Sequence, residues 1–186
     1  MNNNFIIRNA TTGDIQEVKA LLERYHAKNL DDQQKKNGFV TTDMTISQLS
    51  QLCDEENGVA IAIDEDTGKI VAILLGASWS FLKPWPMFEY MAKILPNYSF
   101  RNSQLNSSES YQYGPICIAE EYRGLGIGEK LLDHQRKEFS KNYENVVTFV
   151  NVKNSRSYAF HKRNKFEDIG RFEFNGNHYH LMAIGT

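Results

Sequence analysis

The segment ICIAEEYRGLGIG, residues 116–128, passes from an apolar run through a glycine-rich turn into an amphipathic stretch. Glycines at positions 124, 126 and 128 carry no side chain that would keep a ligand away from the backbone. The first N–H groups of the helix that follows have no partner within the helix and lie at the positive end of its dipole. The segment therefore predicts a strand, a turn and a helix N-terminus that binds a phosphorylated ligand, with Arg123 adding positive charge.

The spacing of the glycines distinguishes between the common phosphate-binding loops. A dinucleotide loop, G-x-G-x-x-G, would need a third glycine where the chain has Glu129, and that carboxylate would repel a pyrophosphate. The chain contains no G-x-x-x-x-G-K-[ST] loop. The pattern that fits is R-x-x-G-x-G, with Arg123, Gly126 and Gly128 in its fixed positions.

This pattern resembles the loop of the GCN5-related N-acetyltransferase (GNAT) family that holds the pyrophosphate of acetyl-coenzyme A between the fourth strand and the third helix. The resemblance implies a set of cofactor-binding residues on the strand and the loop. These are Ile116, Cys117, Ile118, Arg123, Gly124, Leu125, Gly126, Ile127 and Gly128. The alternative is a capped surface helix after an ordinary turn.

The stretch after the loop has the periodicity of a helix that packs on a sheet. Ile127, Leu131, Leu132 and Phe139 fall on one side of a helical wheel, and the charged residues fall mostly on the other.

A second motif, residues 151–166, follows a β-branched run at 146–150 that is typical of a buried strand. It resembles the family segment N-x-x-[AS]-x-x-[FL]-Y-x-K-x-G-F, a strand end and a helix that flank the pantetheine arm of the cofactor. The positions that fit are Asn154, Ser157, Phe160, Arg163 and Phe166. The resemblance implies that Asn154 and Ser157 also bind the cofactor.

Two positions depart from the family pattern. Lys165 replaces a glycine, and we expect Asn164 to take over the left-handed backbone conformation one position earlier. His161 replaces the tyrosine to which the family assigns protonation of the leaving thiolate. An imidazole with a reference pKa of about 6.5 is suited to acid or base chemistry near neutrality. The alternatives are a helix histidine without a chemical task and Tyr158 as the acid.

Composition predicts one ordinary domain, residues 1–186, because 186 residues with 41% hydrophobic side chains can bury one sizeable core. The formal net charge of −2 argues against a nucleic-acid or anionic-membrane surface. No apolar run is long enough to span a membrane and the start of the chain, Met1 to Asn4, is unlike a secretory signal, so we expect a cytoplasmic protein. We expect Cys53 and Cys117 to be reduced and no metal to be bound.

The rest of the chain is consistent with a GNAT-like α/β fold, a mixed and mostly antiparallel sheet of about seven strands flanked by helices. We expect a helix capped by Thr11 or Thr12 that ends near His26, a polar linker at 29–37, and a second helix at about 45–53. The segment 80–112 is longer than an ordinary connection and is rich in aromatic residues. It is expected to contain a helix at 86–95 and a mobile part at 101–110. It either borders the acceptor site or simply covers the sheet.

The resemblance implies an N-acetyltransferase in which an amine attacks the thioester of acetyl-CoA directly, with N–H groups of residues 116–118 orienting the cofactor. The acceptor is a small molecule or a peptide whose identity stays open, as does the oligomeric state, with a homodimer as one option. Gln112 stands near the position of the glutamate base of some family members and cannot replace it. The candidates for a base are Glu109, Tyr111, Tyr113, His178 and His180. The alternative function is a regulatory module that binds acyl-CoA without catalysis.

Overall fold

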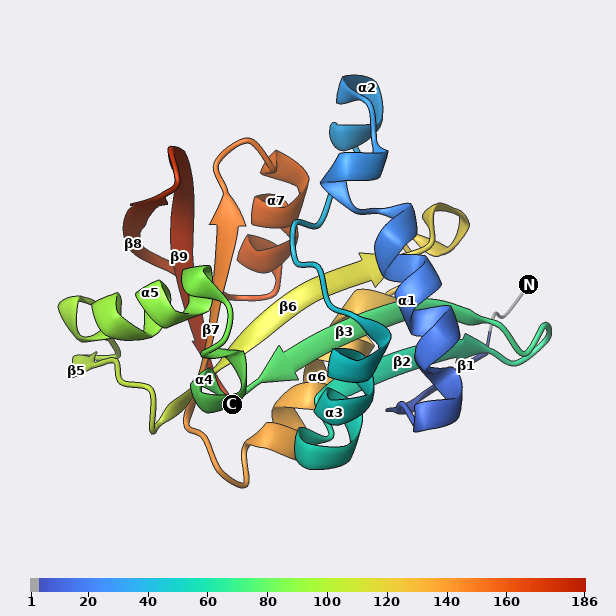
Figure 1. Ribbon diagram of the computed structural model, residues 1–186, viewed down its shortest axis with the longest axis horizontal. Helices are drawn as coiled ribbons and strands as arrows, with labels where there is room; N and C mark the ends of the chain where they lie inside the picture. Colours follow the sequence, from blue (N-terminus) through green and yellow to red (C-terminus); the bar gives the residue numbers. More distant parts are fainter. Residues whose placement is uncertain (1–3) are drawn as a thin grey trace.

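The computed structural model describes residues 4–186 and is built around one seven-stranded sheet (Figure 1). Only β6 and β7 pair in parallel, so the sheet is mixed and mostly antiparallel, as predicted. The strand order is β1 (Phe5–Asn9), β2 (Val59–Asp64), β3 (Ile70–Ala77), β6 (Ser110–Ile118), β7 (Asn145–Asn151), β9 (Asn177–Gly185) and β8 (Glu167–Phe174). Of the segment considered for targeting, residues 1–3 lie outside the described part.

Helices cover both faces of this sheet (Figure 1). The first face carries α1 (Ile15–Arg24), α3 (Ile46–Glu56), α4 (Trp79–Leu82) and α5 (Pro86–Ile94), and the second carries α6 (Ile127–Phe139) and α7 (Ser155–Arg163). Because side chains alternate along a strand, Ile73 and Leu75 of β3 face the first layer, whereas Ala72 and Leu74 face the second. The predicted apolar stripe of α6 is buried on the second face. No helix in the described part of the chain is long and apolar enough to cross a membrane.

The N-terminal connections differ in detail from the prediction. Thr11 caps a short 3₁₀ helix, Thr12–Asp14, and α1 begins only at Ile15 and ends at Arg24. The expected polar linker contains a further helical turn, α2 (Asp32–Lys35), which has a capping box between Asp31 and Gln34.

The inserted segment is more regular than expected. The stretch expected to be mobile, 101–110, begins with part of a hairpin in which β4 (Ser99–Phe100) pairs with β5 (Ser103–Gln104). Leu105, directly after the hairpin, is only 2% exposed. Phe100 of the hairpin is also buried, so two apolar side chains anchor a segment whose composition is otherwise that of a surface loop.

Strand β6 separates from β7 after a few residues, and this is the feature of the sheet that positions the site. The two strands pair only from Ser110 to Gln112 on β6 and from Asn145 to Val147 on β7. Directly beyond this point Gly114 and Pro115 lie opposite the single residue Leu75 of β3, which is a β-bulge. A bulge bends its strand and raises its twist, so β6 turns away from β7 (Figure 1).

The end of α7 contradicts the expectation for Asn164. Asn164 has φ −86°, and Lys165 itself adopts the left-handed conformation with φ +66°. The Asn164 side chain donates a hydrogen bond to the carbonyl of Phe160, 2.9 Å away. The chain therefore keeps the family's backbone turn at the family's position and accepts the steric cost of a Cβ atom there.

Replacing Lys165 by glycine should therefore stabilise the protein. Removing the Cβ from a left-handed residue is worth about 0.5–1 kcal/mol in the free energy of unfolding. Lys162→Gly is the matched control, because this exposed residue lies inside α7, where glycine should cost about 0.5–1 kcal/mol. Urea denaturation of both variants measures whether each change raises or lowers the free energy of unfolding. A Lys165→Gly protein less stable than the parent would contradict the prediction.

Candidate functional site

A cleft of about 450 Å³ opens where β6 has left β7. Its walls are the end of β6, the loop before α6, the first turn of α6, the inner side of α7, and residues 37–40 from the connection between α2 and α3. The lining includes Ile116, Cys117, Ile118, Arg123, Gly124, Gly126, Ile127, Gly128, Asn154 and Ser157 from the predicted cofactor set. Leu125 of that set is 44% exposed and does not line the cleft.

The three glycines of the loop serve two different purposes. Gly124 and Gly126 have φ of +80° and +75°, and a Cβ at either would meet no atom within 4 Å, so both face open space. Gly126 is the N-cap of α6, and no side chain caps the first turn. Gly128 instead allows close packing, because a Cβ there would lie 2.7 Å from the ring of Phe160. The unpaired N–H groups of α6 therefore face the cleft beside a loop without side-chain obstruction.

The splayed strand offers further backbone donors. Ala119 donates from its N–H to the carbonyl of Val71, and hydrogen-bonded pairs alternate along an antiparallel ladder. The peptide groups of Cys117 therefore face β3, whereas those of Ile116 and Ile118 face the gap toward β7. The Cys117 thiol is buried, which raises its pKa to about 12, and in the described residues it is a free cysteine, as is Cys53.

Arg123 connects three parts of the cleft wall. Its Nε donates to the carbonyl of Ile118 at 3.0 Å, and its Nη1 donates to the carbonyl of Asn37 at 3.2 Å. The guanidinium carbon lies 5.0 Å from the ring centroid of Tyr25, as in a cation–π contact. Two of its five N–H groups are thus used by the protein, and its charge remains at the loop.

Residues 37–43, which we call the strap, form the wall opposite β6. Val40 pairs with the segment directly after α1, since its N–H donates to the carbonyl of Tyr25 and its carbonyl accepts from the N–H of Ala27. Asn154, the N-cap of α7, donates from its side chain to the carbonyl of Phe39 at 3.1 Å and accepts from the N–H of Ser157. The predicted residue Asn154 therefore joins α7 to the strap.

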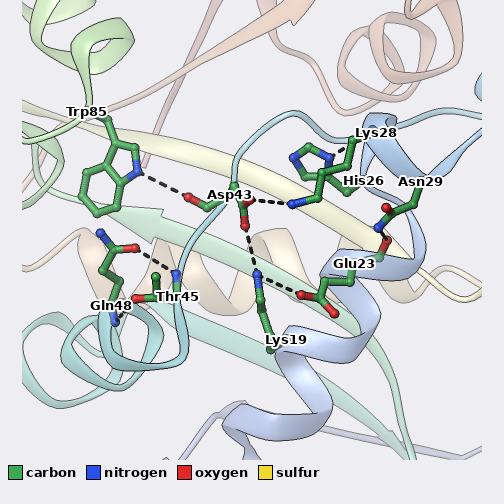
Figure 2. A network of polar contacts seen from close by, with 9 residues as sticks. All are labelled: Lys19, Glu23, His26, Lys28, Asn29, Asp43, Thr45, Gln48 and Trp85. Carbon is green, nitrogen blue, oxygen red and sulfur yellow. Dashed lines mark hydrogen bonds and ion pairs between the residues drawn. The ribbon is translucent and has the colours of Figure 1, made fainter.

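The far end of the strap is held by charges, as Figure 2 shows. The Asp43 carboxylate accepts from Lys28 at 2.7 Å and from Lys19 at 2.9 Å, and these two partners hold its pKa down at about 2. The indole of Trp85 donates to the backbone carbonyl of Asp43 at 3.4 Å (Figure 2). The inserted segment is thus tied to the strap. No local sequence pattern indicated the strap or Tyr25, because their roles depend on contacts between distant segments.

A second, smaller cleft of about 80 Å³ lies on the other side of the strap, between β6 and β7. Its lining carries no ionised side chain among the described residues. It comprises Phe39, Val40, Thr41, Thr42, Gln112, Tyr113, Gly114, Pro115, Ile116, Thr148, Phe149, Val150, Asn151, Asn154, Ser157, His161 and Tyr179. The two clefts meet at five residues that line both of them: Phe39, Val40, Ile116, Asn154 and Ser157.

His161 lies on the second cleft and is only 3% exposed. Burial lowers its pKa to about 4, so the imidazole is neutral at pH 7. The pKa of His161 therefore lies well below the reference value of about 6.5 on which the sequence-based interpretation relied. The ring Nδ1 lies 2.7 Å from the carbonyl of Ser157, which requires the proton to be on Nδ1. Nε2 is then a hydrogen-bond acceptor, and it is buried without a partner among the described groups.

The alternative acid and the candidate bases lie elsewhere or are buried. Tyr158 lines neither cleft, and its hydroxyl donates to Asp168, 3.1 Å away. His180 also contacts Asp168, at 2.7 Å. Burial raises the pKa of Tyr111 and Tyr113 far above the usual value, so both phenols stay protonated. Glu109 accepts from Asn106 and His178 lies near Glu173, and neither lines a cleft.

The aromatic insertion touches the second cleft through one intermediate ring. Phe88 of α5 is 4% exposed and packs edge-to-face on Phe149, with ring centroids 5.8 Å apart. Phe149 lines the cleft. Phe88 therefore supports the wall of the second cleft at Phe149, and Trp85 supports the strap. Among residues 80–112, Gln112 is the one that lines the second cleft.

The lowered pKa of His161 gives a stability test that needs no ligand. The unfolded pKa of about 6.5 exceeds the folded value of about 4, so the unfolded state binds more protons between these pH values. Stability should therefore fall as the pH falls from 6.5 to 4, by up to about 3 kcal/mol from this residue. His161→Phe should remove this part of the pH dependence of the unfolding free energy. An unchanged slope would show that the pKa of His161 is not lowered.

Comparisons with known proteins fit this arrangement of sheet, loop and clefts. The model of the acetyltransferase (GNAT) family matches residues 25–166. No curated protein matches the chain.

Three solved structures illustrate the similarity in fold. An acetyltransferase of the GNAT family from Streptococcus pneumoniae has 17% identity and a TM-score of 0.64, covering 98% of this chain and 99% of that one. The protein yncA from Salmonella typhimurium, solved with its cofactor acetyl-CoA, has 12% identity and a TM-score of 0.65, covering 98% and 94%. The ribosomal-protein-S18-alanine N-acetyltransferase from Escherichia coli has 13% identity and a TM-score of 0.61, also covering 98% and 94%.

Proposed function

The chain belongs to the acetyltransferase (GNAT) family, as its two motifs predicted, and we propose that it transfers the acetyl group of acetyl-CoA to an amine. The observation that carries the proposal is the cleft at the splayed strands, where the N-terminus of α6 and the free edge of β6 present unpaired N–H groups. These donors suit a pyrophosphate and an amide-containing arm, respectively.

The residues present suit two parts of coenzyme A, the pyrophosphate and the pantetheine arm. The loop from Arg123 to Gly128 would hold the pyrophosphate, and the edge of β6 at Ile116 and Ile118 would hold the pantetheine amides, with Asn154 and Ser157 on the opposite wall. The thioester supplies an activated acetyl group when it is bound. The second cleft, which meets the first at Ile116, would then hold the amine.

The pyrophosphate site is tested by Gly126→Asp. Gly126 faces open space at the helix N-terminus, so a carboxylate there should repel the pyrophosphate and lower the affinity for coenzyme A at least 100-fold, as measured by calorimetry. Gly176→Asp is the matched control, because Gly176 has a φ of +72° and a Cβ placed on it would also meet no atom within 4 Å. It carries the same backbone strain and added charge, and should bind normally. Equal binding by both variants, or no binding by the parent, would remove this cofactor assignment.

In the proposed reaction a neutral amine attacks the carbonyl carbon, the carbon–nitrogen bond forms, and the carbon–sulfur bond breaks. The amine loses one proton and the departing thiolate gains one. We assign His161 to this proton transfer in its neutral form, because the residue lines the second cleft and its buried Nε2 is an acceptor without a partner among the described groups. A proton taken there is released readily to a thiolate, since burial disfavours the charged ring.

Two replacements separate a chemical role of His161 from a packing role. His161→Phe preserves the ring that packs against Tyr113 and Phe166 but removes both nitrogens. It should lower kcat by roughly 10²-fold with coenzyme A affinity unchanged. His161→Tyr should retain part of the activity, because its hydroxyl can exchange protons. Full turnover by the phenylalanine variant would leave water as the proton carrier.

The second candidate function is a module that binds acyl-CoA without catalysis. Its support is the absence of an ionised base from the lining of the second cleft among the described residues. Turnover of acetyl-CoA with a panel of amines and peptides separates the two functions. We propose further that the insertion at 80–112 tunes the choice of acceptor through Phe88 and Trp85.

A further inference from the structure

The second cleft differs from the first in its charge. Three arginines and Glu129 line the first cleft, whereas no lysine, arginine, aspartate or glutamate of the described chain lines the second. The titratable side chains of the second cleft are Tyr113, His161 and Tyr179. Burial raises the pKa of both tyrosines and lowers the pKa of His161 to about 4, so all three are neutral at pH 7. The whole wall of this cleft is therefore uncharged.

The charged residues that adjoin this lining in the chain do not supply a free partner for a ligand. Asp43 follows Thr42 of the lining, and its carboxylate is already held by Lys19 and Lys28 (Figure 2). Arg156, beside Ser157, lines the first cleft instead. A ligand in the second cleft that carried a cation would have to compete with two lysines for Asp43.

The second cleft offers uncharged hydrogen-bonding groups instead. Val152 donates from its N–H to the carbonyl of His178, and hydrogen-bonded pairs alternate along an antiparallel ladder. The peptide groups of Phe149 therefore face the gap toward β6, and no strand pairs with β7 on that side beyond Val147. The N–H and the carbonyl of Phe149 are thus available to a ligand, and an amide group can bond to both.

A charge without a partner is strongly disfavoured in such a cleft. An ion that leaves water loses its hydration, and only an ion of opposite sign or several hydrogen bonds can compensate for that loss. A second ammonium or a carboxylate close to the reacting amine would enter the cleft with it and find no counter-ion there. An apolar group would instead meet the side chains of Val40, Pro115 and Ile116.

We propose that the acceptor is a monoamine whose neighbouring group is uncharged, an amide or an apolar group, and that the second cleft rejects diamines and amino acids with a free carboxylate. The proposal rests on the proposed function, because it names the class of acceptor for the same reaction. The selectivity comes from the uncharged wall, which admits the neutral amine and gives a second charge no partner.

Two matched pairs of amines test this selectivity, with acetyl-CoA as the donor. n-Propylamine and ethylenediamine differ by a methyl group in place of an ammonium, and phenylalanine amide and free phenylalanine differ by an amide in place of a carboxylate. We expect kcat/KM, expressed per concentration of neutral amine, to be at least tenfold higher for the uncharged member of each pair. This normalisation removes the different basicities of the amines from the comparison.

A carboxylate added to the lining should change the preference. Asn151→Asp keeps the shape of the side chain and the oxygen that accepts from the N–H of Lys153 at 2.9 Å. It should raise kcat/KM for ethylenediamine at least tenfold relative to n-propylamine and leave coenzyme A affinity within twofold. Asn142→Asp is the matched control, because this exposed residue lines neither cleft and adds the same charge. Its preference should equal that of the parent.

The outcomes separate this inference from the proposed function. If the parent acetylates both members of each pair equally well, or acetylates only amines with a second charge, the inference is wrong while the acetyltransferase function stands. An unchanged preference in a folded Asn151→Asp protein would also overturn it, because a carboxylate in the lining has to attract a second ammonium. If the parent acetylates neither these four compounds nor any amine or peptide of the broader panel, the proposed function fails together with the inference.

Discussion

The site depends on one interruption of the sheet, the loss of pairing between β6 and β7 after Gln112. Unpaired strand edges normally cost stability or invite association, and proteins usually cover them. Here the bulge at Gly114 and Pro115 separates the strands, and the first and second clefts occupy the opening on either side of the strap. The N–H groups of Ile116 and Ile118 are available to a ligand because no strand pairs with them, while the Ile118 carbonyl accepts from Arg123.

A gap in a sheet needs support from other elements to keep its shape. The strap supplies this support, because Arg123, Asn154 and Asp43 fasten it to the loop, to α7 and to α1. Two of these anchors belong to the motifs that would bind coenzyme A. The wall shared by the two clefts is therefore held by the same residues that contact the cofactor in our proposal, which links cofactor binding to the shape of the acceptor side.

The sequence predicted the parts of this arrangement that depend on local patterns. The loop at 123–128 and the apolar face of α6 follow from glycine spacing and periodicity, which act over a few residues. The mixed sheet was implied by the resemblance to the family that these motifs carry. The roles of the strap and of Tyr25 could not be derived in the same way, because they come from contacts between residues far apart in the chain. The expectation for Asn164 failed for a related reason: local propensity favoured asparagine, but the packing of Phe166, 1% exposed, fixes the turn at Lys165.

The replacement of the family tyrosine by His161 is best understood through its surroundings. A tyrosine hydroxyl remains neutral when buried, whereas an imidazole has to lose its charge, and burial among Tyr113, Phe160 and Phe166 brings this about. The carbonyl of Ser157 then fixes the tautomer and leaves Nε2 as an acceptor. The substitution therefore exchanges a hydroxyl, which can donate or accept, for a group that only accepts. In our proposal the amine therefore gives up its proton to Nε2 first, before the thiolate leaves.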